Sequence, residues 1–327
     1  MRAIIPVAGL GSRLKPHTHT IPKVLLNVGG KPILGHILDK LIEENIFKAT
    51  FIYGHLGELI KTYVNENYKS IDAVFIEQEK LEGLGHAIYT AIPTFDEEEL
   101  FIILGDTVFD VDLKNVFHEK ISSLGIKRVD DPSRFGVAIM NNGRIEKLIE
   151  KPKDKVSDLA LVGLYYITNS NALIKSLTTL VEKNIRTRGE LQLTDALQLM
   201  IEDGEVMKTF NVDGWYDCGK PETLLSTNQF LLTLKANKTT KDFPSVVIIP
   251  PVFISESAIV ENSVIGPFTT ISDDAKVYNA VIRNSIIGTS AEVARTMLEN
   301  SIIGNNSIIK GNYKKLNTGD SSEIDFY

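Results

Sequence analysis

Short apolar runs alternate with amphipathic stretches up to about residue 210, and this alternation limits the possible folds more than any other feature of the sequence. Four runs have the length and continuous hydrophobicity of buried strands: residues 3–8, 49–53, 73–77 and 100–104. Strands that alternate with helices predict an α/β fold with a largely parallel sheet covered by helices. Such sheets bind ligands at the carboxyl ends of their strands.

The intervening stretches have the spacing of amphipathic helices. Pro32 stands where a first helical residue is favoured, and the apolar residues that follow it recur with a helical period: Ile33, Leu34, Ile37, Leu38, Leu41, Ile42 and Ile46. Further helices are expected over residues 56–67, from about Gly85, and over about 220–236.

A different pattern begins near residue 246. Three similar six-residue segments, Glu/Arg-Asn-Ser-Val/Ile-Ile-Gly, start at Glu261, Arg283 and Glu299. Internal repeats of this kind predict a solenoid of short parallel strands, and the unequal spacing predicts loops or skipped positions. We therefore expect three segments, with the polar stretch 237–242 near the join: a first domain over 1–240, a solenoid over 245–313 and a polar tail over 314–327.

The composition is that of an ordinary globular protein. The chain has 327 residues, of which 43% are hydrophobic and 24% charged, enough for a large domain and a smaller one. No apolar run approaches the roughly 20 residues of a membrane span, and the N-terminus lacks a signal-peptide pattern, so we expect a cytoplasmic protein. The net charge of −7 argues against nucleic acid as a partner. A single cysteine excludes an intrachain disulfide and a cysteine-based zinc site.

The segment Gly9-Leu10-Gly11-Ser12-Arg13 follows the first strand directly. Glycines let several backbone N–H groups approach phosphate, and Arg13 and Lys23 add positive charge. A dinucleotide-binding motif would need glycine at position 14, which is Leu14, and no P-loop motif occurs. The alternative is a strand-to-helix turn with two solvated cations.

The residues from Ala8 to Pro16, followed by Ile21 to Leu26, resemble the signature of the nucleotide-sugar pyrophosphorylases, or sugar-phosphate nucleotidylyltransferases. The departure is Leu10, where many members have glycine. Other segments follow the family in order: residues 77–78, 83–87, 105–107, 135–137, 150–152, 161–165, 189–195 and 215–222. The resemblance spans nearly the whole chain and is closest to the long-form glucose-1-phosphate thymidylyltransferases. It implies a Rossmann-like, GT-A-like nucleotidyltransferase domain, with a mixed, mostly parallel sheet and helices on both faces. It also implies a small C-terminal left-handed β-helix of the hexapeptide-repeat kind.

The resemblance also implies an activity, the Mg²⁺-assisted transfer of a nucleotidyl group to a hexose 1-phosphate with release of pyrophosphate. It implies catalytic roles for Arg13, Lys23, Asp106 and Lys151. It assigns the nucleotide to Ala8, Gly9, Gly11, Ser12, Arg13, Gln78, Gly83 and Asp106. It assigns the sugar phosphate to Gly136, Glu150, Lys151 and Val162, and the metal to Asp106 and Asp217.

Each of these assignments has a plainer alternative. Asp106 and Asp217 could be strand-terminal turn residues, Glu150 with Lys151 a solvated charge pair, and Gln78 an exposed loop residue. Trp215 is interpreted as a core residue beside the site. Cys218 stands where the family would place threonine, and it is either a reactive thiol or, as we favour, a small buried apolar residue.

The substrates and the overall role stay open at this level. The resemblance favours dTTP and glucose 1-phosphate, with UTP as the second candidate, and no single residue decides between them. A non-catalytic, nucleotide-sugar-binding regulatory subunit and a solenoid acyltransferase are alternatives. All six histidines precede the solenoid, which disfavours the acyltransferase. The solenoid is the candidate for homo-oligomer contacts, because an open coil end or flank is apolar and needs covering.

Overall fold

The computed structural model describes residues 1–96, 99–234 and 243–311, and it divides into two compact units. The first comprises Met1–Asn27 and Lys31–Thr227, and the second Val28–Gly30 and the chain from Asn228. The division falls inside helix α7 (Pro221–Leu234), earlier than residue 240. The polar stretch 237–242 and the tail 314–327 lie outside the described residues.

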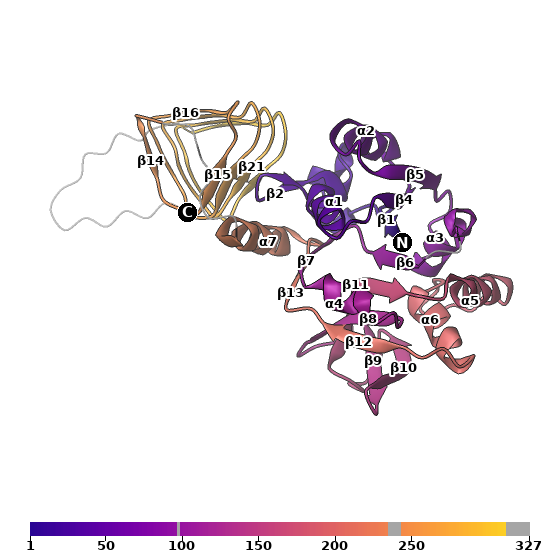
Figure 1. Ribbon diagram of the computed structural model, residues 1–327. Helices are drawn as coiled ribbons and strands as arrows, with labels where there is room; N and C mark the ends of the chain where they lie inside the picture. Colours follow the sequence, from indigo (N-terminus) through magenta and orange to yellow (C-terminus); the bar gives the residue numbers. More distant parts are fainter. Residues whose placement is uncertain (97–98, 235–242, 312–327) are drawn as a thin grey trace. The chain divides into compact units, whose positions relative to one another are not determined.

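The first unit is built on a nine-stranded sheet (Figure 1). Its strand order is β10-β9-β11-β6-β1-β4-β5, and β8 pairs with β11 and β12. The registers place seven strands in one direction and only β10 and β11 in the other, which confirms a mixed, mostly parallel sheet. The strands are β1 (Arg2–Pro6), β4 (Lys48–Tyr53), β5 (Asp72–Glu77), β6 (Leu100–Ile103), β8 (Ser123–Arg128), β9 (Gly136–Asn141), β10 (Arg144–Glu150), β11 (Leu159–Ile167) and β12 (Lys208–Asn211).

Helices cover both faces of this sheet, as the sequence predicts. Successive residues of β1 point to opposite faces, so Ile4 belongs to one hydrophobic cluster, and Ala3 and Ile5 to the other. The cluster around Ile4 is completed by α3 (Leu84–Thr90), α5 (Ser170–Glu182) and α6 (Leu193–Glu202). The other is completed by α1 (Ile33–Glu43), α2 (Gly57–Asn67) and α4 (Leu113–His118).

Helix α1 begins one residue later than the sequence predicts. Pro32 has φ −57° and ψ 149°, an extended conformation, and ends the two-residue strand β3 (Lys31–Pro32), which pairs with β2 (Asn27–Val28). The fixed φ of proline fits both a helix and an extended segment, so the residue type alone does not locate the helix start.

The described part of the second unit is a left-handed parallel β-helix of three four-stranded sheets, β14-β17-β20-β23, β15-β18-β21-β24 and β16-β19-β22-β25. Neighbouring positions along one sheet, such as Val247, Val264, Val281 and Met297, are 17 or 16 residues apart. Arg283 and Glu299 end β20 and β23 of one sheet and lie one coil apart, whereas Glu261 ends β16 of another sheet. The repeat spacing is therefore unequal because the first repeat lies at a different corner of the β-helix. The strands are β14 (Val246–Ile248), β15 (Val252–Ile254), β16 (Ile259–Glu261), β17 (Ser263–Ile265), β18 (Thr269–Ile271), β19 (Lys276–Tyr278), β20 (Val281–Arg283), β21 (Ile286–Ile287), β22 (Glu292–Ala294), β23 (Met297–Glu299), β24 (Ile302–Ile303) and β25 (Ile308–Lys310).

The repeated Asn-Ser pair makes the corners of this β-helix. Asn262, Asn284 and Asn300 have φ values of 47°, 42° and 50°, in the left-handed region that asparagine tolerates well. The hydroxyl of Ser263 donates to the carbonyl of Glu261 and accepts from the N–H of Ala280 in the next coil. Each repeat therefore turns the chain, and the first two repeats also tie one coil to the next.

One buried asparagine joins three separate parts of the second unit. The Asn228 side chain is completely buried, and its Oδ1 accepts hydrogen bonds from the Gly29 N–H (2.8 Å) and the Thr270 hydroxyl (2.6 Å). Its Nδ2 donates to the Phe268 carbonyl at 3.0 Å. These bonds explain why Val28–Gly30 belongs with the C-terminal unit.

A search of the described residues for a helix long and apolar enough to cross a membrane found none.

Candidate active site

A cavity of about 420 Å³ opens beside the end of β1 in the first unit. This position, at the carboxyl ends of parallel strands, is the expected one for the fold. The cavity brings together every residue predicted to bind nucleotide, and also Lys23. Its lining comprises Pro6, Val7, Ala8, Gly9, Gly11, Ser12, Arg13, Lys23, Val24, Gln78, Leu81, Gly83, Leu84, Ala87, Leu104, Asp106, Glu190 and Gly219.

The glycine loop has a backbone that requires glycine at position 11. Gly11 has φ +58°, and a Cβ there would lie 3.0 Å from both the Lys23 Cβ and the Thr18 Cγ2. The Thr18 hydroxyl donates to the Gly11 carbonyl at 2.9 Å and holds the loop in this form. A Cβ on Gly9 would meet nothing within 4 Å, so the space beside that residue is open. The loop is therefore fixed at Gly11 and accessible at Gly9, as a backbone that receives phosphate must be.

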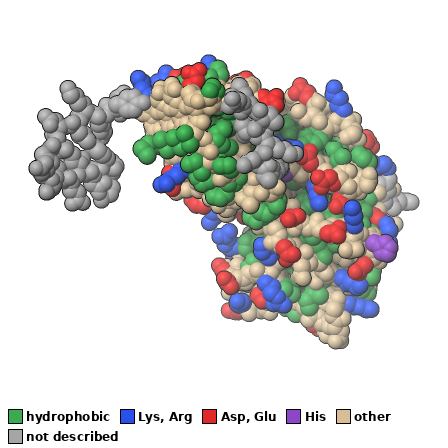
Figure 2. Space-filling view, turned by 60° about the vertical axis from the view of Figure 1, so that its left-hand side comes forward, with side chains coloured by type: hydrophobic (Ala, Val, Ile, Leu, Met, Phe, Trp, Pro, Cys, Tyr) green, Lys and Arg blue, Asp and Glu red, His purple; other side chains and the backbone are tan. Residues whose placement is uncertain are grey.

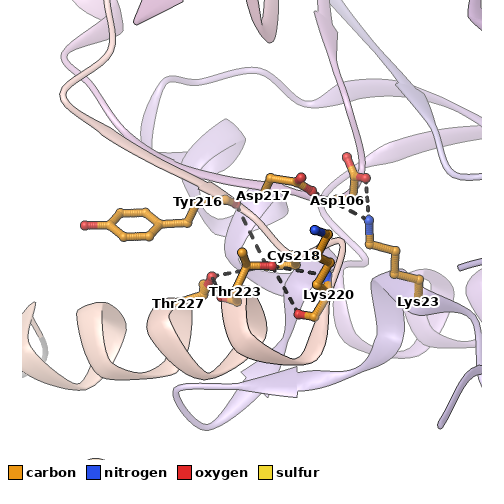
Figure 3. Close-up of polar contacts among 8 residues, drawn as sticks. All are labelled: Lys23, Asp106, Tyr216, Asp217, Cys218, Lys220, Thr223 and Thr227. Carbon is orange, nitrogen blue, oxygen red and sulfur yellow. Dashed lines mark hydrogen bonds and ion pairs between the residues drawn. The ribbon is translucent and has the colours of Figure 1, made fainter. Parts of the chain in front are cut away.

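Two aspartates meet because strand β7 (Thr107–Asp110) pairs antiparallel with β13 (Gly214–Asp217). Asp217 lies opposite Thr107 in this register, and the Cys218 N–H donates to the Asp106 carbonyl at 3.1 Å. The ammonium of Lys23 faces both carboxylates: its Nζ is 2.5 Å from Asp106 Oδ2 and 4.0 Å from Asp217 Oδ1 (Figure 3). Neither aspartate is a simple turn residue, because each faces the same buried ammonium.

The charges around Asp217 set its protonation. Burial, and next the negative charge of Asp106, raise the pKa of Asp217, while Lys23, Arg13 and Arg134 oppose the shift. The side chain of Lys23 is only 9% exposed, so water weakens its attraction to the two carboxylates only in part. A second cation placed here would relieve the repulsion between the two carboxylates.

The two carboxylates fit a hard divalent cation. Mg²⁺ is commonly held by one or two carboxylates together with substrate phosphates and water, and Asp106 borders the cavity where phosphate would lie. A search of the described residues found no group of three or more His, Cys, Asp and Glu side chains that could hold a metal by themselves. The arrangement therefore suits an ion that is shared with a substrate.

Gln78 is not the exposed loop residue of the plainer alternative. It is 5% exposed, lies directly after β5, and lines the cavity. Its Nε2 is 3.3 Å from the Gly83 carbonyl oxygen and 3.3 Å from His86 Nδ1. Gly83 has φ +113°, and a Cβ there would lie 2.6 Å from the Leu191 carbonyl oxygen, so only glycine fits.

The predicted sugar-phosphate residues form a second group that does not line this cavity. Glu150 is only 8% exposed at its side chain; its Oε1 is 3.3 Å from Lys151 Nζ, and its Oε2 accepts from the Thr194 hydroxyl at 2.7 Å. A Cβ on Gly136 would come within 3.0 Å of the same Oε2. The pair is therefore not a solvated one, since the carboxylate is buried and held from two sides. Val162 is buried in the core.

Sequence reasoning missed several residues of both groups. His86 and Glu190 lie within segments that resemble the family but are not singled out by the sequence. His86 contacts Gln78, and Glu190 lines the cavity. Thr194 supports Glu150, and the neighbouring Asp195 has a buried Oδ2 without a hydrogen-bond partner among the described residues. Burial raises the pKa of Asp195, and the charge of Glu150 adds to the shift. The sequence marks these residues only by placing them within the segments 83–87 and 189–195, which resemble the family.

Cys218 and Trp215 border the aspartates as packing residues. The Cys218 thiol is fully buried and donates to Thr227 Oγ1 at 3.5 Å, and burial raises its pKa to about 12. This confirms the interpretation as a small buried side chain. The Trp215 ring packs edge-on against Phe135, with the ring centroids 4.9 Å apart. Phe135 immediately precedes Gly136, so this contact supports the sugar-phosphate group.

Known proteins share this architecture. A model of the nucleotidyl transferase family matches residues 2–233. A glucose-1-phosphate thymidylyltransferase from Streptomyces antibioticus is 30% identical, and the match covers 99% of both chains. The UTP–glucose-1-phosphate uridylyltransferase AglF of Haloferax volcanii is 32% identical over 68% of this chain and 93% of that protein. A solved structure of UDP-glucose pyrophosphorylase with UDP-glucose matches 71% of this chain and 98% of that chain, at 25% identity and a TM-score of 0.61.

Proposed function

The chain belongs to the nucleotidyl transferase family and is a sugar-phosphate nucleotidylyltransferase, and we propose that its substrates are dTTP and glucose 1-phosphate and its metal Mg²⁺. The observation that carries the proposal is the cavity that gathers the glycine loop, Lys23, Asp106 and Gln78. The near full-length similarity to a thymidylyltransferase supports dTTP and glucose 1-phosphate over other pairs.

The reaction in this proposal is an in-line attack by a phosphate oxygen of glucose 1-phosphate on the α-phosphorus of the nucleotide. The new P–O bond joins the two phosphates, and the bond from the α-phosphorus to the pyrophosphate oxygen breaks. A phosphate monoester is already anionic near neutral pH, so the attack needs no general base. The protein must instead align two anions and offset the charge that moves onto pyrophosphate.

The cations and the loop serve this purpose. Arg13 and the loop N–H groups would hold the β- and γ-phosphates, and Lys23 would lie near the α-phosphate. Lys151 would hold the phosphate of the sugar, and the buried Glu150 would accept hydrogen bonds from sugar hydroxyls. The fixed position of Glu150 between Lys151 and Thr194 supports its role in orienting the sugar. Gly136 and Val162 would complete that subsite through the backbone.

Asp106 and Asp217 would hold Mg²⁺ between them and the substrate phosphates. When bound, the ion supplies Lewis-acid stabilisation of the phosphoryl oxygens and of the leaving pyrophosphate. Burial and the charge of Asp106 keep the pKa of Asp217 raised although Lys23 lowers it in part, and this incomplete offset supports a further cation at the two carboxylates.

UTP is the second candidate nucleotide, and the similarity to a uridylyltransferase favours it specifically. The test mixes the purified protein with Mg²⁺, glucose 1-phosphate and each nucleoside triphosphate in turn, and follows pyrophosphate release. Release with dTTP well above UTP supports the proposal, and release with UTP above dTTP replaces the nucleotide. The same assay with a chelator in place of Mg²⁺ tests the metal.

Two broader alternatives, a regulatory subunit and an acyltransferase, each predict a different result. Binding of nucleotide without pyrophosphate release, with every sugar phosphate tried, would indicate a regulatory subunit. Acetylation of a sugar phosphate with acetyl-CoA would indicate an acyltransferase. The presence of Arg13, Lys23, Asp106 and Asp217 around one site argues against both.

We also propose a cytoplasmic location and a homo-oligomer formed through the β-helix unit. Exposed apolar side chains on that unit include Met297, 78% exposed, and hydrophobic groups gather on the face of the β-helix turned toward the viewer in Figure 2. A second copy of the chain would cover such a surface. Sedimentation velocity of the full chain at micromolar concentration tests this, and a monomer at every concentration would remove the proposal.

A further inference from the structure

The side-chain amide of Gln78 is held in one orientation. Its Nε2 faces two acceptors, the Gly83 carbonyl oxygen and His86 Nδ1, each at 3.3 Å. A carbonyl oxygen can only accept, so the Gly83 contact requires the amide nitrogen on that side. Within the part of the chain that the structure describes, Gln78 Oε1 accepts no hydrogen bond. A buried amide in the cavity wall thus has a free acceptor.

We propose that His86 is a positioning residue for base selection: its Nδ1 accepts from Gln78 Nε2 and holds the amide so that Oε1 is presented to the base. This inference rests on the proposed nucleotidyl transfer and on Gln78 as the base contact. His86 itself touches no substrate in this account. It acts by fixing which end of an amide faces the cavity.

The consequence is a preference for one class of base. Uracil and thymine carry an N3–H that donates to a fixed acceptor. Cytosine has an unprotonated N3, an acceptor, which would face Oε1 without a hydrogen between them. A buried acceptor opposite an acceptor leaves both without a partner, and that is how hydrogen-bonding sites reject the wrong ligand. If the amide turned over, Nε2 would face the base, and the preference would reverse.

The Gly83 carbonyl alone is a weak constraint. That oxygen also accepts the N–H of Ala87 within α3 at 3.1 Å, so it is shared between two donors. Its contact with Gln78 is long, at 3.3 Å. The imidazole supplies a second acceptor from the first turn of the same helix, and the two together hold the amide more firmly than either would separately. Removing His86 should therefore free the amide to turn rather than unfold the segment.

The experiment compares the wild type with His86→Leu, which removes the acceptor at similar volume, and His86→Gln, which can return one. Steady-state kinetics are measured with glucose 1-phosphate and dTTP, UTP or CTP. In His86→Leu we expect the KM for the best pyrimidine nucleotide to rise about tenfold, ~1.4 kcal/mol, with kcat within about twofold. Its preference for that nucleotide over CTP should fall by a similar factor, and His86→Gln should restore most of both.

The controls separate this inference from its premise. Wild-type turnover with any nucleotide is measured first, and its absence would reject the proposed function without reference to His86. The KM for glucose 1-phosphate should not change in either variant, whereas general damage would change it. Unaltered nucleotide KM and CTP discrimination in a folded His86→Leu would overturn the inference. Should His86→Leu not fold, His86→Gln and His86→Ala carry the same comparison, with direct titration of UDP and CDP as the second readout.

Discussion

The ammonium of Lys23 lies 2.5 Å from Asp106 Oδ2, although the two residues are 83 positions apart in the chain. The same ammonium is 4.0 Å from Asp217 Oδ1. One buried cation thus faces two carboxylates and partly offsets the repulsion between them. The site has the charges needed to handle phosphate and metal already in place, and Lys23 is its common element.

Replacing Asp106 should abolish turnover without unfolding the protein. Asp106→Asn keeps the shape and removes the charge, so we expect pyrophosphate release to fall by about 100-fold or more, with little change in melting temperature. Asp110→Asn is the matched control, because Asp110 is an exposed aspartate at the far end of β7, the strand that follows Asp106. Near-normal activity of Asp106→Asn at saturating Mg²⁺ would remove this residue from the site.

Replacing Asp217 should cost activity but raise the stability of the metal-free protein. Its pKa is raised on folding, so the folded state disfavours the charged carboxylate at neutral pH. We expect Asp217→Asn to melt about 1–3 °C higher without metal. The gain in melting temperature is complete above the pKa of Asp217 in the folded protein. It shrinks as the pH falls toward 3.8, the pKa in the unfolded chain, because the wild-type carboxyl then becomes protonated too. Melting curves across this range in chelator test the sign, and a gain that grows at low pH would contradict it.

Gly83 should tolerate no side chain. Gly83→Ala adds a strained φ and a Cβ 2.6 Å from the Leu191 carbonyl oxygen, so the base-binding segment must shift. Gly143→Ala is a matched control, since Gly143 also has positive φ but open space around it. We expect about 1 kcal/mol of destabilisation in the control, and a larger loss with a raised KM for nucleotide in Gly83→Ala. Equal effects of the two substitutions, measured by urea unfolding and kinetics, would show that the close approach does not matter.

Cys218 should be unreactive in the folded protein. Burial raises its pKa to about 12, so almost no thiolate exists at pH 8. Iodoacetamide should label the native protein far more slowly than the urea-unfolded chain, and Cys218→Ala should keep most of the activity. Mass spectrometry measures the extent of labelling over time. Fast labelling of the native protein would show that the Cys218 thiol is accessible to solvent.

Asn228→Ala should destabilise the second unit strongly. The substitution leaves the Gly29 N–H, the Thr270 hydroxyl and the Phe268 carbonyl without this partner, and we expect a loss on the order of 3 kcal/mol. Ser226→Ala serves as the control on the same helix, because its exposed hydroxyl bonds only within the turn. Chemical denaturation monitored by circular dichroism compares the two, and equal stabilities would rule out the buried tie as a stabilising feature.

Much of the fold could be predicted because local periodicity determines which residues are buried. The helical spacing after Pro32 and the continuous apolar run at 100–104 correspond to α1 and β6. The reversed direction of β11 and the pairing of β7 with β13 depend on segments far apart in the chain, which no local pattern reveals. The burial of Asn228, the first residue after the division inside α7, could not be predicted either, because its residue type does not show that it is buried.

The candidate site divides in the same way. The glycine loop and Lys23 could be found because closely spaced residues carry the motif. The Asp106–Lys23–Asp217 arrangement required the resemblance, since its three members come from separate elements. The contact between His86 and Gln78 could not be predicted, because it depends on how α3 packs beside the end of β5.

The tie made by Asn228 also has a consequence for the order of synthesis. Gly29 leaves the ribosome 199 residues before Asn228, and Thr270 follows 42 residues later. A nascent chain that ends between Asn228 and Phe268 contains Asn228 and Gly29 but neither the Phe268 carbonyl nor the Thr270 hydroxyl. The C-terminal unit therefore cannot complete its polar core during translation until its second coil has been made, and a fragment that starts at Asn228 would lack the N-terminal turn that completes it.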